Sequence, residues 1–316
     1  MALRATQILS FAIVTLDAAM EFLLLYMIFF KTPKAMARFK IYLALLCLNS
    51  LATSVSMGFI WQPEFMTPPL CVYNNGLFRN LIDNHVMATV NSSLTIQYMQ
   101  FLLLSYHYVY SKMNYDLPSR ETYRRFCAEM IFAVSLPAIN FALMFNAKPS
   151  DAYIISHTNY KPSDYSYFTC YFPGDFHADG LFFNYFLIFF IAYSNFFIFS
   201  AVFLLVKVFK LLRNSPSFVS LSTLKVQKMF FTNVVIQTLT PVGCVHAPVI
   251  LSFVFELMGA DDISYVLFKL TSISNALNSV VSCSCIIWMT KPYREFVFQM
   301  LSDVHDKLKD LLCFCH

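Results

Sequence analysis

Apolar segments long enough to cross a bilayer recur along this chain. Seven such runs lie near residues 7–30, 39–62, 80–110, 126–146, 181–208, 226–257 and 264–289. A bilayer core of roughly 30 Å requires about 20 apolar residues in a helix, and a helix satisfies its own backbone hydrogen bonds where lipid offers no partner. Only 13% of the residues are charged, against about 25% in soluble domains. The sequence therefore predicts an all-α membrane protein folded as a seven-transmembrane helix bundle.

Lysine and arginine are distributed unequally between the segments that join these runs. On one side, 17 of the 22 lie in residues 31–40, 111–125, 207–228 and 291–316. The other side holds four, which are Arg4, Arg79, Lys148 and Lys161. The remaining one, Lys269, falls inside the seventh run. Because positive charge is retained on the cytoplasmic side, we expect the N-terminus outside the cell and the C-terminus inside it.

The sixth run contains the residues most suited to bending a helix. It begins with Lys225 and Lys228 and is interrupted further on by Gln237, Pro241 and Pro248. A proline removes one backbone hydrogen bond and crowds the carbonyl one turn before it, so a helix can bend there. We expect one helix over 226–257, kinked at both prolines, that acts as a moving lever.

Cysteines are scattered along the chain, and only Cys71 and Cys170 fall on the side expected outside the cell. In an oxidising compartment these two would pair and hold the second outer loop at the head of the third helix. The alternative is a pair of free thiols. No cofactor or metal site is expected, because the cysteines lack metal-ligand spacing and no phosphate-binding loop or nucleophile motif is present.

The C-terminal segment 291–316 has the pattern of an amphipathic helix separate from the membrane domain 1–290. Leu301, Val304 and Leu308 recur at helical spacing, and aspartates occupy the other side. Such a helix is expected to lie along the inner leaflet. Cys313 and Cys315 near its end are either palmitoylation sites or ordinary cytosolic thiols.

Three motifs in order resemble the nematode serpentine chemoreceptors of the Str superfamily, with class d or h favoured. The first inner loop matches at Thr32, Pro33, Lys34, Met36, Phe39 and Lys40. The sixth run matches at Ser222, Thr223, Gln227, Gln237 and Pro241, and the segment after the seventh run matches at Pro292, Tyr293 and Arg294.

The resemblance implies a rhodopsin-like bundle that works as a chemosensory G-protein-coupled receptor. Its partners would be a small extracellular ligand of the odorant or pheromone class, a heterotrimeric G protein and membrane lipids, with no nucleic acid. Its location would be the plasma membrane, in a sensory cilium. A ligand-gated channel of seven-helix subunits is the alternative, and an enzyme is not expected.

One position departs from the family pattern. The family usually has an arginine between aromatic residues at the end of the third span, and Val109 stands there, between Tyr108 and Tyr110. Either Lys112 substitutes for that arginine in an intracellular ionic latch, or the latch is absent and coupling to the G protein is altered.

Polar residues within the apolar runs are the candidate ligand contacts. In the third run, Asn84, Asn91 and Thr95 share one helical stripe, which should face protein or a cavity because amides lack partners in lipid. The stripe either lines a ligand pocket or bonds neighbouring helices. Further pocket candidates, each with a structural role as the alternative, are Asn184, His246 and Lys269.

Two acids in the first run lie at membrane depth. Asp17 and Glu21 are four residues apart and share one helix face, and such acids usually face the bundle interior. Lys269 is their expected partner, as an ion-pair switch or a structural pair, unless it extends to the outer surface. A buried Lys269 could also form the imine that holds retinal in an opsin-like photoreceptor, although Asn275 is followed by Ala276 rather than by the proline usual in opsins.

The residues expected to face a G protein are basic or lie beside the seventh run. They are Lys112, Lys207, Lys210, Arg213, Lys225, Lys228, Tyr293 and Arg294. The same lysines and arginines also attract anionic lipid, so their charge is consistent with either partner.

The expected orientation leads to a direct prediction. A tag on the N-terminus of the chain should bind antibody on intact cells, whereas a tag on the C-terminus should bind only after permeabilisation. Tags accessible from the opposite sides would overturn the assignment of all four basic segments to the cytosol.

Overall fold

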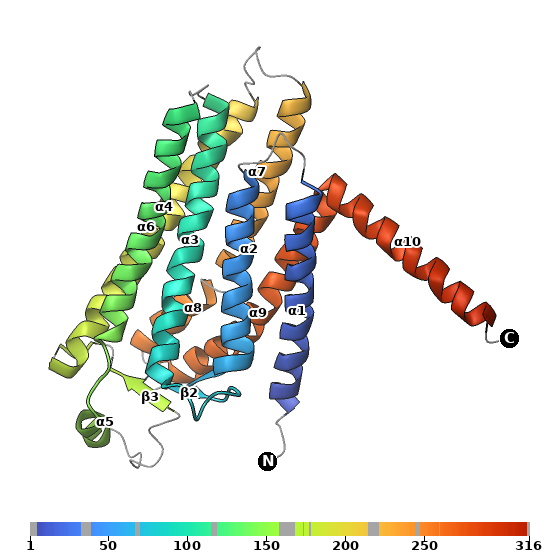
Figure 1. The fold of residues 1–316 in the computed structure, drawn as a ribbon. Coiled ribbons are helices and arrows are strands. Elements are labelled where there is room, and N and C mark those ends of the chain that lie inside the picture. The colour runs from blue at the N-terminus through green and yellow to red at the C-terminus, as the bar shows by residue number, and fades with distance from the viewer. Residues whose placement is uncertain are drawn as a thin grey trace.

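Long helices aligned side by side form most of the molecule (Figure 1). The computed structural model describes residues 5–314 apart from 33–38, 67–69, 115–118, 158–167, 173, 177, 214–220, 244–246 and 259. The helices are α1 (Ala5–Phe30), α2 (Phe39–Val55), the π-helix η2 (Ser56–Trp61), α3 (Asn84–Asn114), α4 (Ser119–Phe145), α5 (Asp151–His157), α6 (Ala178–Arg213), α7 (Leu221–Pro241), α8 (Ala247–Leu257), α9 (Asp261–Met289) and α10 (Lys291–Phe314).

Four helical stretches among the described residues are long and apolar enough to cross a membrane. They are Phe11–Phe30, Phe39–Trp61, Cys127–Phe145 and Gly180–Arg213. Helix α3 has 31 residues, which is ample length, but buried polar side chains such as Asn91 and Gln100 reduce its hydropathy. It needs little apolar surface, because α2, α4, α6 and α7 all pack against it. The molecule is a membrane-protein bundle with a polar-lined central helix.

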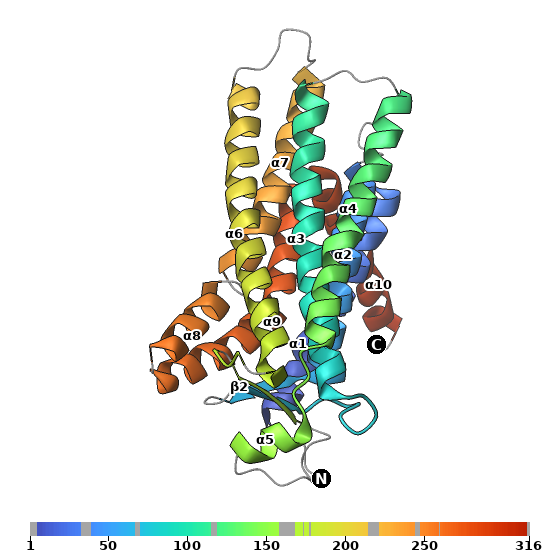
Figure 2. The same ribbon diagram turned by 90° about the vertical axis from the view of Figure 1, so that its left-hand side faces the viewer.

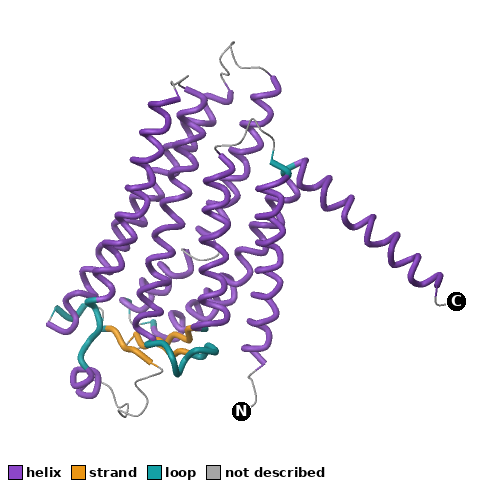
Figure 3. The backbone as a smooth tube through the Cα atoms, viewed as in Figure 1, coloured by secondary structure: helices purple, strands orange, loops and turns teal. Residues whose placement is uncertain are grey.

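The ends of the bundle follow the order of the chain. Helices α1, α3 and α6 end, and α4 and α7 begin, at the end of the bundle opposite the N-terminus (Figures 1 and 3). The basic segments expected in the cytosol adjoin these helix ends. At the other end lie the N-terminus, α5 and a small sheet.

The sixth run is not the single kinked helix that we expected. Helix α7 ends at Pro241, and α8 starts at Ala247 with Pro248 in its first turn. Proline is tolerated in a first turn because its missing N–H has no helical partner there. Helix α8 then leaves the line of α7 and packs along α9 (Figure 2). Pro241 is thus the last residue of α7, with π-helical residues 242–243 after it, and Pro248 lies in the first turn of a second helix.

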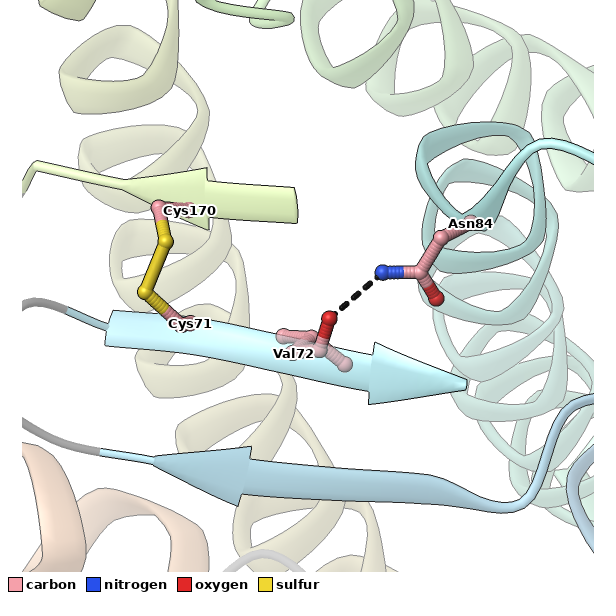
Figure 4. Close-up of a disulfide and its surroundings, with 4 residues drawn as sticks. All are labelled: Cys71, Val72, Asn84 and Cys170. Carbon is pink, nitrogen blue, oxygen red and sulfur yellow. Dashed lines mark hydrogen bonds between the residues drawn. A yellow bond between two sulfur atoms is a disulfide. The ribbon is translucent and has the colours of Figure 1, made fainter. Parts of the chain in front are cut away.

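A three-stranded antiparallel sheet, absent from the all-α prediction, covers the outer end of α3. Its strands are β1 (Pro63–Met66), β2 (Leu70–Asn74) and β3 (Phe168–Tyr171), in the order β1-β2-β3. Cys71 of β2 is opposite Cys170 of β3, and the two form the predicted disulfide. Figure 4 shows this bridge beside Asn84, the first residue of α3.

The amphipathic helix predicted after the seventh run is α10, which projects away from the bundle (Figure 1). Its start is fixed to the end of α1: the Tyr293 and Thr32 hydroxyls are 2.7 Å apart, and the Lys31 ammonium lies 4.5 Å from the centre of the Phe296 ring. Beyond this junction Leu301 and Val304 are exposed. This surface fits a helix that contacts lipid.

Opening the disulfide should destabilise the fold. The bridge joins residues 99 positions apart, and a native disulfide contributes typically about 2–5 kcal/mol. We expect Cys170→Ser to lower the free energy of unfolding by about that much and to reduce surface expression, measured by thermal unfolding in detergent and by flow cytometry.

The matched control is Cys127→Ser, which removes a free, partly exposed thiol and should change neither reading. Cys71→Ser and the double variant should lose as much as Cys170→Ser does. Additive losses in the double variant would contradict a bond between the two sulfurs.

Candidate functional site

The end of α7 is tied to α3 by a hydrogen bond to its backbone. Pro241 has no N–H, so the carbonyl of Gln237, one turn earlier, cannot receive the usual helical bond from it. The hydroxyl of Tyr98 on α3 donates to this carbonyl at 3.2 Å. A side chain of the central helix thus satisfies a backbone group that the proline leaves without its helical donor.

A second tyrosine of α3 makes a similar hydrogen bond to a backbone carbonyl of α7, one turn of α7 closer to the start of that helix. Tyr106 Oη donates to the carbonyl of Val234 at 3.4 Å, and Thr238 Oγ1 on α7 itself donates to the same oxygen at 2.8 Å. All three side chains are buried. On the other flank, Asn233 Nδ2 donates to Thr290 Oγ1 at 2.9 Å and joins α7 to the residue that ends α9. Helix α7 is therefore held by specific polar contacts on two sides.

Several buried polar atoms of α3, α6 and α7 have no hydrogen-bond partner among the described residues. They belong to Gln100, whose amide is unpaired at both atoms, and to Tyr193, Ser194 and Gln237. An unsatisfied buried polar group costs about 1–3 kcal/mol. Side chains that remain unpaired between packed helices are candidates for contact with a bound molecule. Asn91 of α3 and Asn233 of α7 each have one further unpaired side-chain oxygen. Of these residues, sequence analysis had singled out Asn91 as a pocket candidate and Gln237 for a different role.

The predicted pocket residues of α3 are engaged with the protein. Asn84 donates to the carbonyl of Val72 at 2.6 Å and accepts a bond from the indole of Trp61, so it joins α3 to the sheet and to η2 (Figure 4). Asn91 donates to Ser56 Oγ at 3.0 Å, and its Oδ1 is unpaired among the described residues. Thr95 donates to its own helix, at the carbonyl of Asn91.

The other predicted pocket residues are not brought together with these. Asn184 of α6 is buried and holds the preceding loop, with bonds to the backbone of Gly174, Asp175 and Gly180. Lys269 belongs to α9, but its side chain is outside what the structure describes, and His246 lies in 244–246, also outside it. Their contact with a ligand remains a prediction.

A buried histidine at the outer end was not among the predicted site residues. His85 Nδ1 lies 2.9 Å from the hydroxyl of Tyr171 in β3, and its Nε2 lies 3.1 Å from the carbonyl of Phe145 at the end of α4. The ring therefore links α3, α4 and the sheet. Only its place beside Asn84 in the sequence hinted at this role.

A polar network joins α2, α3 and α4 near their inner ends. One oxygen of Glu129 accepts from Tyr42 Oη at 2.7 Å, and the other lies 2.7 Å from His107 Nδ1. Val109, where the sequence analysis expected the arginine usual in the family, is buried in the core. The inner end of α3 is thus held by His107 and Glu129, two residues that the latch hypothesis did not include.

The residues predicted to face a G protein divide into two groups. Exposed basic side chains at the inner ends of α6 and α7 are Lys207, Lys210, Arg213, Lys225 and Lys228. Lys112 belongs to α3, with its side chain outside the described set. Tyr293 is only 1% exposed and Arg294 donates to the carbonyl of Trp288, so both stabilise the junction with α10 in this conformation.

Comparison with known families matches the chain to a receptor family. The family model described as serpentine type 7TM GPCR chemoreceptor Srh covers residues 4–303, nearly the whole chain. The chain belongs to this family. No curated protein matches it.

Membership confirms the resemblance to the Str superfamily and selects class h from the two classes favoured by the sequence. The Srh receptor is a seven-helix membrane protein of a chemoreceptor class, not of an enzyme class. The described helices supply the seven spans as α1, α2, α3, α4, α6, the α7–α8 pair and α9.

Both acids of α1 are buried in this Srh receptor, between α2 and α9. Glu21 accepts hydrogen bonds from Ser279 Oγ at 2.6 Å and from the Cys47 thiol. Asp17 is 0% exposed, and neither of its oxygens has a hydrogen-bond partner among the described residues. With Cβ atoms about 6 Å apart, two charged carboxylates would repel by about 3 kcal/mol at an effective dielectric constant of 20.

The described partners of Glu21 are neutral. Glu21 is level with Ser279 of α9, and Lys269 precedes Ser279 by ten residues. At 1.5 Å of rise per residue, the two backbone positions on α9 are about 15 Å apart. The side chain of Lys269 is outside what the structure describes, so its ion pair with the acids of α1 stays a prediction.

An ion pair on the outer surface stabilises the start of α3. The Lys148 ammonium contacts the Asp83 carboxylate, which also accepts a bond from the backbone N–H of His85. Partial burial opposes ionisation of Asp83, but these partners outweigh it and hold the pKa of Asp83 below its ordinary value. The resulting stabilisation is present above the unfolded-state pKa and is lost as pH falls through the lowered one.

Replacing Asn84 separates its structural role from a role in the ligand pocket. Asn84→Ala leaves the buried indole N–H of Trp61 without its acceptor, which should cost about 1–3 kcal/mol in thermal unfolding. Asn146→Ala is the matched control, because Asn146 follows the end of α4, is exposed, and its described side-chain bond goes to the carbonyl of Ala142. A stable Asn84→Ala receptor with reduced ligand potency would instead indicate direct contact with ligand.

Proposed function

We propose that this Srh receptor binds a small extracellular molecule of the odorant or pheromone class and activates a heterotrimeric G protein through movement of α7. The observation that carries the proposal is the bond from Tyr98 to the carbonyl of Gln237, at the proline that ends α7. This contact and the bond from Tyr106 to the carbonyl of Val234 link the central helix to the helix expected to move, and only the Tyr98 bond is made to a carbonyl that lacks its helical donor.

The unpaired polar atoms support a particular kind of ligand. Gln100, Tyr193, Ser194 and Gln237 present amide and hydroxyl groups from α3, α6 and α7, and α6 is rich in aromatic residues. A small, mostly apolar molecule with one or two hydrogen-bonding groups would satisfy such atoms and bury its remaining surface. Thr95, His246 and Lys269 stay in the proposal as further contacts.

The arrangement supports α7 as the moving helix. It packs more extensively on α3 and α9 than on α6, and its polar links to those two neighbours are few. A ligand that binds better when α7 has swung outward shifts the population towards that state. A shift from 1:99 to 99:1 requires about 5.5 kcal/mol of differential binding, so smaller shifts need less.

The proposed G-protein surface consists of the exposed basic side chains at the inner ends of α6 and α7. Outward movement of α7 would carry Lys225 and Lys228 away from α3 and uncover the surface between them. The network of His107 and Glu129 would hold α3 still during this movement. We include Lys112, Tyr293 and Arg294 as contacts that become available only in the moved conformation.

The proposal extends to location and lipid contact. The receptor would work in the plasma membrane of a sensory cilium, with residues 291–316 along the inner leaflet. Palmitoylation of Cys313 or Cys315 would strengthen this contact.

The direct test is a screen of volatile and pheromone-like molecules on cells that express the full chain, read as a second-messenger signal. A response that disappears on G-protein blockade supports the proposal. A ligand-evoked current that persists after the blockade would instead assign the chain to the ligand-gated channels.

Removing the Tyr98 hydroxyl should release α7. A net hydrogen bond contributes about 0.5–1.5 kcal/mol, so Tyr98→Phe should raise the active fraction by about 2- to 12-fold. We expect higher basal signalling, measured per receptor at the cell surface. Tyr185→Phe on the exposed face of α6 is the control and should signal as the wild type does. Unchanged basal signalling and ligand potency in Tyr98→Phe would contradict the link.

Restoring the missing N–H should have the opposite effect. Pro241→Ala supplies a helical donor to the carbonyl of Gln237 and favours continuation of α7 into residues 242–246. We expect a weaker maximal response at normal surface expression. An unchanged dose–response curve would argue against a break at Pro241 as part of the switch.

A further inference from the structure

Three large apolar side chains are exposed in the loop that joins β2 to α3. Leu77 is 61% exposed, Phe78 42% and Leu81 78%. A contiguous apolar patch on a protein surface marks a contact with a partner, a ligand or a membrane. The proposed signalling mechanism gives this loop no role, so the patch requires a separate explanation.

Backbone hydrogen bonds hold the loop against the end of α2. The N–H of Leu77 donates to the carbonyl of Phe59 at 2.9 Å, and the N–H of Gly76 donates to the carbonyl of Trp61 at 2.8 Å. A Cβ atom at Gly76 would collide with the carbonyl oxygen of Ile60, so the close approach of the two backbones requires glycine here. The apolar side chains that follow are therefore presented from a fixed position.

The same hydrogen bonds determine the depth of the loop in the membrane. Phe59 and Trp61 belong to the end of the membrane span Phe39–Trp61, and Leu81 precedes Asn84, the first residue of α3, by three positions. The loop lies beside the outer end of α3 (Figure 2). The patch is thus level with the ends of two helices of the bundle, where the hydrocarbon of a bilayer meets its head groups.

The turn itself suits this depth. The N–H groups of Leu81 and Ile82 both donate to the carbonyl of Phe78, at 2.9 and 3.1 Å, which lowers the cost of placing this backbone beside lipid. The side chain of Ile82 packs on the buried cluster around Trp61, whereas that of Leu81 is exposed. Arg79 lies in the same turn, and a guanidinium among apolar side chains is typical of the head-group level.

We propose that the turn 77–81 inserts into the outer leaflet of the membrane, with Leu77, Phe78 and Leu81 among the upper acyl chains of phospholipids. The backbone of the turn would stay at the level of the head groups. Because Asn84 follows directly and bonds to Val72 of the sheet, the insertion would hold the start of α3 and the sheet at one depth. This role goes beyond ligand binding and G-protein activation.

The test uses the full chain in lipid nanodiscs that hold one receptor each, and it needs no odorant. A fluorescent unnatural amino acid replaces Leu81. Its emission is measured with phosphatidylcholine spin-labelled in the upper acyl chain and, separately, with iodide in the water. We expect loss of emission with the spin-labelled lipid and little loss with iodide.

The control position is Ile155 on α5, which is also apolar and is 44% exposed. Helix α5 lies at the outer end of the molecule, beyond the ends of the long helices (Figure 1). The same fluorophore at Ile155 should lose emission with iodide and keep it with the spin-labelled lipid.

A double variant tests whether the apolar side chains cause the insertion. Leu77→Asp combined with Phe78→Asp, in the receptor with the fluorophore at position 81, should lose the quenching by lipid, because charged side chains are costly in hydrocarbon. Leu77→Ile combined with Phe78→Leu is the matched control, which keeps the apolar surface and should keep the quenching.

Three outcomes would overturn the proposal. Iodide quenching at position 81 as strong as at position 155 would place the turn in water. A fluorophore at position 81 that neither quencher reaches would identify protein as the cover of the patch. Undiminished lipid quenching in the aspartate variant would show that these side chains do not cause the insertion. If that variant does not fold, the comparison of positions 81 and 155 still decides the question.

Discussion

Backbone groups at membrane depth have no water to bond, so each break in a helix has to be repaired by protein. In this receptor the break comes at Pro241, and the repair comes from Tyr98 on the central helix. A repair made by one side chain is weaker than a continuous helix, because a side-chain bond can be given up without unwinding anything. The same constraint stabilises the described conformation and supports the proposal that α7 can adopt another.

The contacts around this hydrogen bond hold the neighbouring helices α2, α3 and α4 together. At the outer end the disulfide joins two strands of the sheet, and Asn84 and His85 fasten the sheet to α3 and α4. At the inner end Glu129 joins α2, α3 and α4. Helices α2, α3 and α4 thus form a fixed group with polar ties at both ends. The α7–α8 pair is joined to this group by hydrogen bonds near the middle of α7. A molecule bound beside these hydrogen bonds would act on the contacts that oppose movement of α7.

The sequence predicted the features that depend on charge and on local pattern. The seven runs, the cysteine pair and the amphipathic α10 follow from hydropathy, compartment and helical spacing, and the family match confirms the receptor class. The separation of α7 from α8 was missed, because a proline in sequence does not show whether a helix bends or ends. The outer sheet was missed because its strands have only four or five residues and because β3 pairs with β2 across 99 positions of sequence.

Side-chain partners were the least predictable part. The stripe of Asn84, Asn91 and Thr95 could be recognised as facing inward, but its contacts with Trp61, Val72 and Ser56 depend on where η2 and the sheet pack. The pairing of Glu21 with Ser279 likewise depends on the register of α1 against α9. Periodicity predicts which face of a helix is buried. The residue that a buried side chain contacts is known only from the packed bundle.

In the proposed mechanism, α7 moves away from α3 when the receptor is active. The most direct measurement is the distance between fluorescent unnatural amino acids at Lys112 on α3 and Lys225 on α7, followed in nanodiscs by energy transfer. The account predicts that this distance grows when an activating odorant and a G protein are added, and that it is already larger in Tyr98→Phe without odorant. An unchanged distance in a receptor that still activates its G protein would contradict the account.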